Sequence, residues 1–251
     1  MRGIYDIHCH ALPGVDDGAK SLSESLQILQ MEWDAGVEHV LLTPHYRRGM
    51  FETDRHIVQK QFAKLQEACT QKLPELQLSL GCEFHSNMDM TDQLQEEPAY
   101  RLCGSRTILL EFSSRDSRDY IRGRVYEAVR NGYRVIIAHP ERYPAMQEDL
   151  DFTEDVMDIG ARLQINADSI LGEDGRRVKK YCKQLLKYEM ADFIGSDAHN
   201  CTDRPTRLGE CAAWIEKKMG RATARRLLID NPEKLLQDCA GGYPSVDYKN
   251  V

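Results

Sequence analysis

Short apolar runs recur along the chain, separated by longer stretches in which apolar residues return at helical spacing. Several of the short runs are continuously apolar rather than alternating, which is typical of parallel strands covered on both faces. We therefore predict seven strands, within GIYDIH, EHVLLTPH, LQLSLGCEF, TILLEFS, YRVIIAHP, RLQINA and ADFIGSDAH.

The longer stretches predict amphipathic helices that cover these strands. The first, SLSESLQILQMEWDAGV, begins with Ser21 and Glu24 at the spacing of a capping box, ends near Gly36 and places Trp33 in the core. The remaining helices are predicted over 53–73, 117–131, 148–160, 174–189 and 207–219, with two more around RATARRLLID and NPEKLLQDC.

About seven β-α units follow one another without a long linker, a low-complexity segment or a repeat of fixed period. Repeated units of this kind in a chain of 251 residues favour an α/β fold with a single parallel, TIM-like (β/α)7 barrel. An open doubly wound sheet is the alternative. We assign residues 1–239 to this domain and predict a loosely held tail over 240–251, which is rich in glycine, proline and polar residues.

The composition narrows the class of protein. A formal net charge of -7 argues against a nucleic-acid-binding protein, which normally carries a basic field. The eight cysteines are scattered without a CxxC pair, which fits a reducing compartment. The first strand pattern begins at Gly3 or Ile4, leaving no room for a signal peptide, and no apolar run reaches the ~18 residues of a membrane span. We therefore expect a cytoplasmic protein that does not insert into membranes.

The predicted strands end in side chains that bind metals. In a barrel these ends share one rim, so residues distant in sequence converge there. Imidazole and carboxylate together suit manganese, iron or zinc, and more than four such ligands imply more than one ion. The residues at these strand ends are His8, His10, His45, Glu83, Glu111, His139, Asp197 and His199.

Taken singly, each of these residues has an ordinary structural explanation. His45 fits a loop cap, Glu111 a paired buried carboxylate, and Asp197-Ala-His199 an Asx turn. Their shared position at the ends of successive strands favours the metal site. Spacing alone leaves open whether Asp16 or Asp17 joins them or only forms a tight turn. We interpret His39, His56 and His85 as structural or surface residues.

The motifs DIHCHALPGVDDG, TPHYRRGMFET, GCEFH, LLEF, IAHPERY and GSDAHN together resemble those of the polymerase-and-histidinol-phosphatase (PHP) superfamily. Within it they are most similar to the bacterial metal-dependent protein-tyrosine phosphatases of capsule and exopolysaccharide operons. The resemblance runs from Tyr5 to about IDNPEKLL. It implies a distorted barrel of seven β/α units that holds three divalent ions, usually described with manganese.

Carried over by position, the resemblance also implies the ligand sets. The first ion takes His8, His10, Glu83 and Asp197. The second shares Glu83 and adds Glu111 and His139. The third takes Asp17, the aspartate next to the glycine, with His45 and His199.

The chemistry expected of such a site is hydrolysis of a phosphate monoester. Divalent ions shield the phosphate charge and lower the pKa of bound water from ~15.7 toward ~7, so that a metal-bound hydroxide attacks phosphorus. Arg142 and Arg204 match arginines that the family uses on phosphate. Arg47 and Arg48 follow His45 and are expected to contact phosphate or acidic flanks of a peptide.

One motif points to a different mechanism. Cys201 and Arg207 have the spacing of the cysteine-dependent tyrosine phosphatases, which use a glycine-rich backbone cradle. Here the loop carries Asp203 and Pro205 and no glycine. A carboxylate and a missing N–H both spoil a phosphate-binding loop, so we interpret Cys201 as incidental.

The leading prediction is thus a phosphotyrosine-protein phosphatase acting on the tyrosine-rich tail of a bacterial tyrosine kinase that controls surface polysaccharide, as the resemblance implies. A small-molecule phosphatase such as a histidinol-phosphate hydrolase is the alternative on the same scaffold. A non-catalytic metal-binding regulatory module is the alternative from another class.

Overall fold

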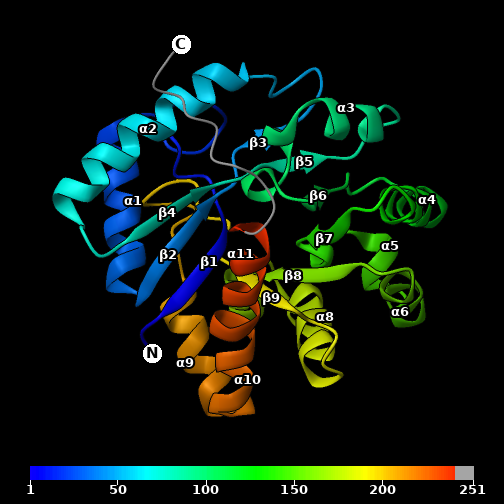
Figure 1. Cartoon of the computed structure of the whole chain (residues 1–251). Coiled ribbons are helices and arrows are strands. Elements are labelled where there is room, and N and C mark those ends of the chain that lie inside the picture. The colour runs from blue at the N-terminus through cyan, green and yellow to red at the C-terminus, as the bar shows by residue number, and fades with distance from the viewer. Residues whose placement is uncertain (241–251) are drawn as a thin grey trace.

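A computed structural model of the chain describes residues 1–240 (Figure 1). Strands and helices alternate along it, and the strand pairings within its sheets are parallel. The strands are β1 (Ile4–Cys9), β2 (Val37–Leu42), β3 (His45–Tyr46), β4 (Gln77–Leu80), β5 (Glu83–His85), β6 (Thr107–Glu111), β7 (Arg134–Ala138), β8 (Arg162–Asn166) and β9 (Phe193–Gly195). The predicted α/β class with parallel strands is confirmed.

The strands form two sheets, ordered β1-β2-β4 and β3-β5-β6-β7-β8-β9. Each of the seven predicted apolar runs contains a strand, but two runs are split into two strands. Between β2 and β3 lies Pro44, which has no N–H for a ladder bond. Between β4 and β5 lies Gly81, where a Cβ atom would approach Leu102 Cδ2 to 2.8 Å.

Backbone hydrogen bonds join the two interrupted runs at their breaks. They also join the end of β1, in the first sheet, to the segment after β9, in the second. Glu83 N–H donates to the Pro44 carbonyl at 3.2 Å. Beyond the end of β9, Asp197 N–H donates to the His8 carbonyl at 2.8 Å, and His10 N–H donates to the Ala198 carbonyl at 2.9 Å. The segment after β9 therefore lies directly against the end of β1.

Helices cover the outside of the strands (Figure 1). They are α1 (Leu22–Asp34), α2 (Arg55–Lys72), α3 (Met90–Glu96), α4 (Arg118–Arg130), α5 (Pro144–Gln147), α6 (Leu150–Asp158), α7 (Ala167–Leu171), α8 (Arg176–Lys187), α9 (Leu208–Met219), α10 (Arg221–Arg225) and α11 (Asn231–Ala240). Short turns are η1 (Pro98–Tyr100), η2 (Leu102–Gly104), η3 (Pro140–Arg142) and the π-helical η4 (Arg226–Asp230).

Every predicted helical stretch contains a helix, whereas α3, α5 and α7 were not predicted because they are too short to show a repeating apolar pattern. At the start of α1, the Ser21 hydroxyl accepts the Glu24 N–H as expected. The Glu24 carboxylate instead accepts the N–H of Lys20, so the capping box is only half formed. Trp33 is half-buried against the core.

A separate apolar cluster lies among the strands and is closed by the last helix. Its strand members are Ile7, Leu41, Leu109, Ile136, Ala138 and Phe193. Leu235 and Cys239 of α11 pack onto this cluster from one side. Residues 241–251, the greater part of the predicted tail, lie outside the described residues. Among the described residues, no helix has both the length and the apolar character needed to span a bilayer.

Candidate active site

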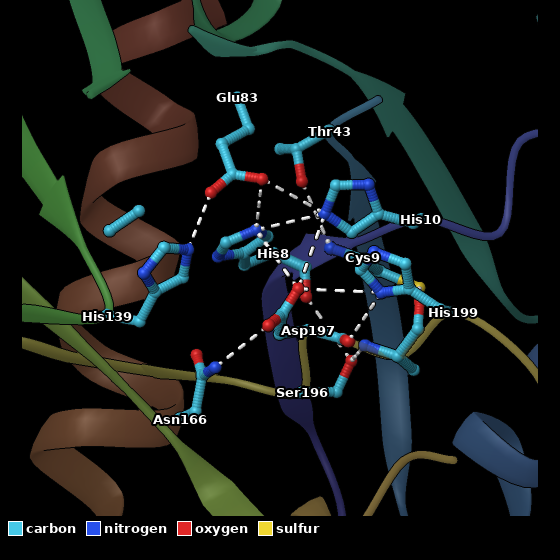
Figure 2. Close-up of polar contacts among 12 residues, drawn as sticks. His8, Cys9, His10, Thr43, Glu83, His139, Asn166, Ser196, Asp197 and His199 are labelled. Atoms are coloured by element: carbon cyan, nitrogen blue, oxygen red, sulfur yellow. Dashed lines mark hydrogen bonds and ion pairs between the residues drawn. The ribbon is translucent and has the colours of Figure 1, made fainter. Parts of the chain in front are cut away.

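The polar strand ends meet around one buried carboxylate, Glu83, the first residue of β5 (Figure 2). Its Oε2 lies 3.1 Å from His8 Nε2, 3.2 Å from His10 Nε2 and 2.9 Å from His45 Nδ1. Its Oε1 lies 2.7 Å from His139 Nε2. Histidines from the ends of three predicted strand runs therefore contact one fully buried anion, which belongs to a fourth run.

A second buried carboxylate, Asp197, faces the same histidines from the segment after β9. Its Oδ1 lies 3.6 Å from His8 Nε2, 3.4 Å from His10 Nε2 and 3.6 Å from His199 Nδ1. Asp197 has a φ of 53° and His139 a φ of 32°, in the left-handed region that side chains other than glycine rarely adopt. Such strain persists only where the surroundings hold it. Two of the four non-glycine residues with positive φ in the described chain belong to the cluster, and the others are Cys103 and Glu189.

The loop that carries Asp197 is held from below by Asp6 of β1. The Asp6 carboxylate accepts the N–H of Ser196 at 2.9 Å and its hydroxyl at 2.6 Å. The Ser196 Oγ in turn accepts the N–H of Ala198 at 3.0 Å. These bonds account for the unusual backbone of Asp197 and aim its carboxylate at the histidines.

The two adjacent aspartates have different positions. Asp17 Oδ1 lies 3.6 Å from His45 Nε2 and 3.5 Å from His199 Nε2, so it faces the cluster. Asp16 Oδ2 instead contacts His10 Nδ1 at 2.9 Å and accepts the N–H of His45 at 3.0 Å. Asp16 thus supports a histidine of the cluster, a role that the sequence analysis did not assign.

Glu111 stands at the edge of the group, with its Oε2 3.9 Å from His45 Nδ1. Burial and the neighbouring charge of Glu83 raise the pKa of Glu111 to about 8. The pKa of Glu83 is well below its ordinary value. Burial alone would raise this pKa, but the charges of the His8 and His45 imidazoles have the larger, opposite effect. Burial, with the positive charge of a neighbouring group, lowers the pKa of both His139 and His199 to about 4.

Several atoms in the cluster are buried without a hydrogen-bond partner in the described part of the chain. They are His45 Nδ1, Glu83 Oε2, Glu111 Oε2, Asp197 Oδ1 and His199 Nε2. An unsatisfied buried polar atom costs free energy, so a gathering of such atoms needs an explanation. One donor atom from each of His8, His10, Glu83 and Asp197 lies within 4.8 Å of the others, and the same holds for His45, Glu83 and Glu111, and for His10, His45 and His199. This donor set fits divalent cations.

The outer nitrogens of four histidines are engaged, which orients the rings. His8 Nδ1 is 2.8 Å from Gln164 Oε1, and His10 Nδ1 contacts Asp16. His139 Nδ1 is 3.2 Å from the Tyr143 hydroxyl, and His199 Nδ1 is 2.8 Å from the Asp197 carbonyl oxygen. Partners of this kind fix the ring orientation of metal-binding histidines.

Three of these supporting residues were missed in the sequence. The Asn166 amide donates to Asp197 Oδ2 at 2.9 Å, and Gln164 Nε2 donates to Asn166 Oδ1 at 2.8 Å. The signal was present, because Gln164 and Asn166 alternate with apolar residues inside a buried strand. Tyr143 follows His139 in the motif HPERY and showed no comparable pattern.

Arg142 and Arg204 both contact Asp197 Oδ2, at 2.6 Å and 3.0 Å. Their side chains are 32% and 37% exposed, so both guanidinium groups remain open to solvent beside the cluster. Arg47 is half-buried and its charge acts on Glu111, whereas the exposed Arg48 forms an ion pair with Asp89. The structure thus brings Arg142 and Arg204 into contact with Asp197, whereas Arg48 pairs outside the cluster.

Residues 4–237 match the family described as capsular polysaccharide synthesis, CpsB/CapC. The chain belongs to the CpsB/CapC family. The tyrosine-protein phosphatase CpsB of Streptococcus pneumoniae is 31% identical over 94% of this chain and 99% of the relative. The tyrosine-protein phosphatase YwqE of Bacillus subtilis is 28% identical over 94% of this chain and 92% of the relative.

A solved structure agrees with this assignment. It belongs to a study of YwqE from Bacillus subtilis and CpsB from Streptococcus pneumoniae, described as unique metal-dependent tyrosine phosphatases. It superposes with a TM-score of 0.82 at 26% identity, over 90% of this chain and 96% of the other. The resemblance seen in the sequence motifs is therefore confirmed at the level of the CpsB/CapC family.

In this CpsB/CapC member the loop after His199 does not form a phosphate cradle around Cys201. The Asn200 side-chain oxygen accepts the N–H groups of Thr202, Asp203 and Arg204 at 2.8–3.0 Å, so these donors are already used. Burial raises the pKa of the Cys201 thiol, which disfavours a thiolate. Both observations agree with the interpretation of Cys201 as incidental.

The histidines interpreted as structural or surface residues lie in other surroundings. His39 Nε2 is 2.8 Å from the Ser79 hydroxyl, and His85 Nε2 is 3.1 Å from the Ser113 hydroxyl. Burial lowers the pKa of His39 to about 4. His56 is exposed near the start of α2, where its N–H is capped by Asp54.

We predict that Tyr143→Phe destabilises the fold. The Tyr143 hydroxyl accepts the Phe112 N–H at 3.0 Å and donates to the Ala138 carbonyl at 2.8 Å, so its loss leaves buried backbone groups unsatisfied. The free energy of unfolding in urea should fall by about 1–3 kcal/mol. The matched control Tyr126→Phe, at a tyrosine that is 55% exposed, should change it little. Equal effects of the two substitutions would contradict this account.

Proposed function

We propose that this CpsB/CapC protein is a metal-dependent phosphatase that hydrolyses phosphotyrosine on proteins. The proposal rests on one observation. At the strand ends, beside Arg142 and Arg204, imidazole nitrogens and carboxylate oxygens that could bind metal are buried without hydrogen-bond partners in the described part of the chain. Relatives that cover nearly the whole chain bear the name tyrosine-protein phosphatase.

We assign three divalent ions to the cluster, with manganese as the expected metal and iron or zinc as alternatives. The first ion is assigned to His8, His10, Glu83 and Asp197. The second is assigned to Glu83, Glu111 and His139. The third is assigned to Asp17, His45 and His199. The close approach of His8, His10, Glu83 and Asp197 supports the first set, and the contacts of Asp17 with His45 and His199 support the third. For the second set, His139 lies 2.7 Å from Glu83, whereas the compact donor group around Glu111 contains His45 in place of His139.

When bound, such ions shield the negative charge of a phosphate monoester and make water a nucleophile at neutral pH. The protein's own residues do the rest. The guanidinium groups of Arg142 and Arg204 match the oxygens of a phosphate and are already oriented by Asp197. A tyrosine phenolate, with a pKa of ~10, leaves more easily than an alkoxide and needs less help from an acid.

The fold that we propose is one distorted barrel of seven strands, in which β2 with β3 and β4 with β5 each count as a single interrupted strand. The bond from Glu83 N–H to the Pro44 carbonyl, at the paired breaks, supports this at one edge. The bonds between the ends of β1 and β9 support it at the other. Residues 1–239 then form a single domain.

The proposed substrate is the phosphorylated, tyrosine-rich tail of a bacterial tyrosine kinase that regulates capsule or exopolysaccharide. The family's connection with capsular polysaccharide synthesis supports this context. We place the reaction in the cytoplasm, because eight cysteines remain unpaired and free thiols persist in reducing compartments. Arg47 is proposed to contact the phosphate or an acidic flank of the peptide. Arg48 is proposed to leave its ion pair with Asp89 and to contact the same groups of the substrate.

Removal of metal should abolish the activity. Dialysis against a chelator is expected to reduce hydrolysis of a phosphotyrosyl peptide to background, and manganese is expected to restore it best. The same peptide carrying phosphoserine and the small molecule histidinol phosphate serve as comparison substrates. A much higher kcat/KM for histidinol phosphate would assign the protein to small-molecule chemistry, and a metal-loaded protein inactive on all three would indicate a regulatory module.

Removal of either arginine should slow the chemical step. Arg142→Ala and Arg204→Ala are each expected to lower kcat about 100-fold or more, as for other preorganised groups that stabilise developing charge. Because both side chains contact Asp197, metal content must be measured by mass spectrometry alongside the kinetics. Loss of metal in parallel with loss of activity would show that they act only by holding Asp197.

The rival cysteine mechanism is tested directly by Cys201→Ser. We expect turnover close to that of the unmodified protein, because the backbone donors of the loop are occupied by Asn200. Steady-state kinetics on an aryl phosphate measure the turnover of the variant. The same assay on the unmodified protein after thiol alkylation shows whether any thiol is required. A folded, metal-loaded Cys201→Ser protein without activity would reverse the assignment of the nucleophile.

A further inference from the structure

Helix α8, RRVKKYCKQLLK, carries a strongly one-sided charge distribution. Its buried residues are Tyr181, Cys182, Leu185 and Leu186, which pack into the core. Its outer side carries Arg176, Lys179, Lys180, Lys183 and Lys187, which we call the basic stripe. The helix contains no acidic residue, although the chain as a whole has a net charge of -7.

The charges of the basic stripe are not neutralised within the protein. In the part of the chain that the structure describes, none of its five residues lies within ion-pair distance of a carboxylate; the neighbouring Arg177, outside the stripe, pairs with Glu148 at 2.9 Å. Lys179 donates to the Leu171 carbonyl, whereas the side chains of Arg176, Lys180, Lys183 and Lys187 are exposed. Surface cations normally alternate with anions, and like charges within one helix repel one another. An anionic ligand on the stripe removes this repulsion.

The surface of the stripe is open. Its residues, with Gln184, border a shallow space of about 400 Å³. Aromatic rings adjoin it, since Lys183 Nζ lies 5.8 Å from the ring of Trp214 and Lys187 Nζ lies 5.0 Å from that of Tyr188. Tyr188 is 56% exposed, so an aromatic face stands beside the cations.

The stripe starts close to the active site but is separate from it. The helix begins two residues after Asp174 and packs against η3, which carries Arg142. From there α8 runs along the outside of β8 and β9 (Figure 1). Its twelve residues span about 18 Å at ~1.5 Å per residue, so a ligand on the stripe extends well away from the metal cluster.

We propose that the basic stripe binds a second phosphorylated part of the substrate, so that the enzyme prefers tyrosine-rich segments carrying several phosphates. This inference rests on the proposed phosphotyrosine phosphatase activity. One phosphotyrosine enters the metal cluster while neighbouring phosphates on the same flexible chain contact the lysines of α8. Tethering through the second contact raises the local concentration of the next phosphotyrosine at the cluster.

An extended peptide suits the stripe better than a membrane does. An open row of cations along one helix accommodates an extended anionic chain, whereas membrane-binding helices present large apolar residues for insertion. Among the large exposed apolar side chains of the described residues, only Tyr188 adjoins the stripe. Phosphates and tyrosine rings also match the mixture of lysines and aromatic rings found there.

The test compares two triple variants that remove equal charge. The first is Lys180→Gln, Lys183→Gln and Lys187→Gln on the stripe; the control is Lys60→Gln, Lys64→Gln and Lys72→Gln on α2, which lies on the other side of the molecule (Figure 1). The substrates are a synthetic peptide of about 25 residues carrying several phosphotyrosines and a short peptide carrying one.

For the stripe variant we expect KM for the multiply phosphorylated peptide to rise about tenfold at low ionic strength, with kcat unchanged. The difference should disappear at high salt, where exposed charges are screened. Kinetics on the short peptide and those of the control variant should match the unmodified protein. An unchanged KM in the stripe variant, or an equal rise in the control, would overturn the proposal.

Two further measurements separate the remaining outcomes. If the stripe variant loses binding to vesicles of anionic phospholipid but keeps its KM for the peptide, the stripe is a membrane surface and the proposal is wrong. Fluorescence anisotropy of the labelled, multiply phosphorylated peptide measures docking without turnover. If the unmodified protein binds this peptide through the stripe but hydrolyses no phosphotyrosine, the docking inference stands and the proposed activity fails.

Discussion

A carboxylate with no access to water lies at the centre of this structure. Glu83 contacts His8 and His10 at the end of β1, His45 at the start of β3 and His139 just after β7. Burial of a single ionised group costs several kcal/mol unless opposite charges and hydrogen bonds compensate for it. The strand ends that converge on Glu83 provide this compensation, and the cluster holds together only while all of them are in place.

Asp197 links the two halves of the proposed chemistry. One of its oxygens faces the histidines of the cluster, whereas the other contacts Arg142, Arg204 and Asn166. In the proposed chemistry, the carboxylate assigned to the metal ions therefore also orients the two guanidinium groups assigned to the phosphate. A substitution of Asp197 would disturb the histidine cluster and the two arginines at once. The arginine variants, with metal content measured as a second readout, are therefore more informative.

Much of this arrangement was predictable from the sequence, because a parallel sheet brings strand ends to one edge. His8, Glu83 and Asp197 were recognised by their position at the ends of apolar runs, and the structure brings them together. The breaks at Pro44 and Gly81 were not predicted, because the apolar pattern of a run is the same whether it forms one strand or two strands with a short interruption. Gln164 and Tyr143 were missed for a different reason. The strand pattern shows that Gln164 is buried, but it does not show that Gln164 contacts His8 or that Tyr143 contacts His139.

The contact between β1 and the segment after β9 joins parts of the chain that are synthesised at different times. Ser196 and Asp6 are bonded although 190 residues separate them. A ribosome adds about 5–20 residues per second, so the first strand waits on the order of ten to forty seconds for the segment that completes its surroundings. The apolar cluster among the strands also lacks the side chains of α11 until the chain has been synthesised as far as Cys239. The growing chain therefore carries its first two histidines long before Asp197 exists, so the proposed metal cluster is complete only after this later segment has been made.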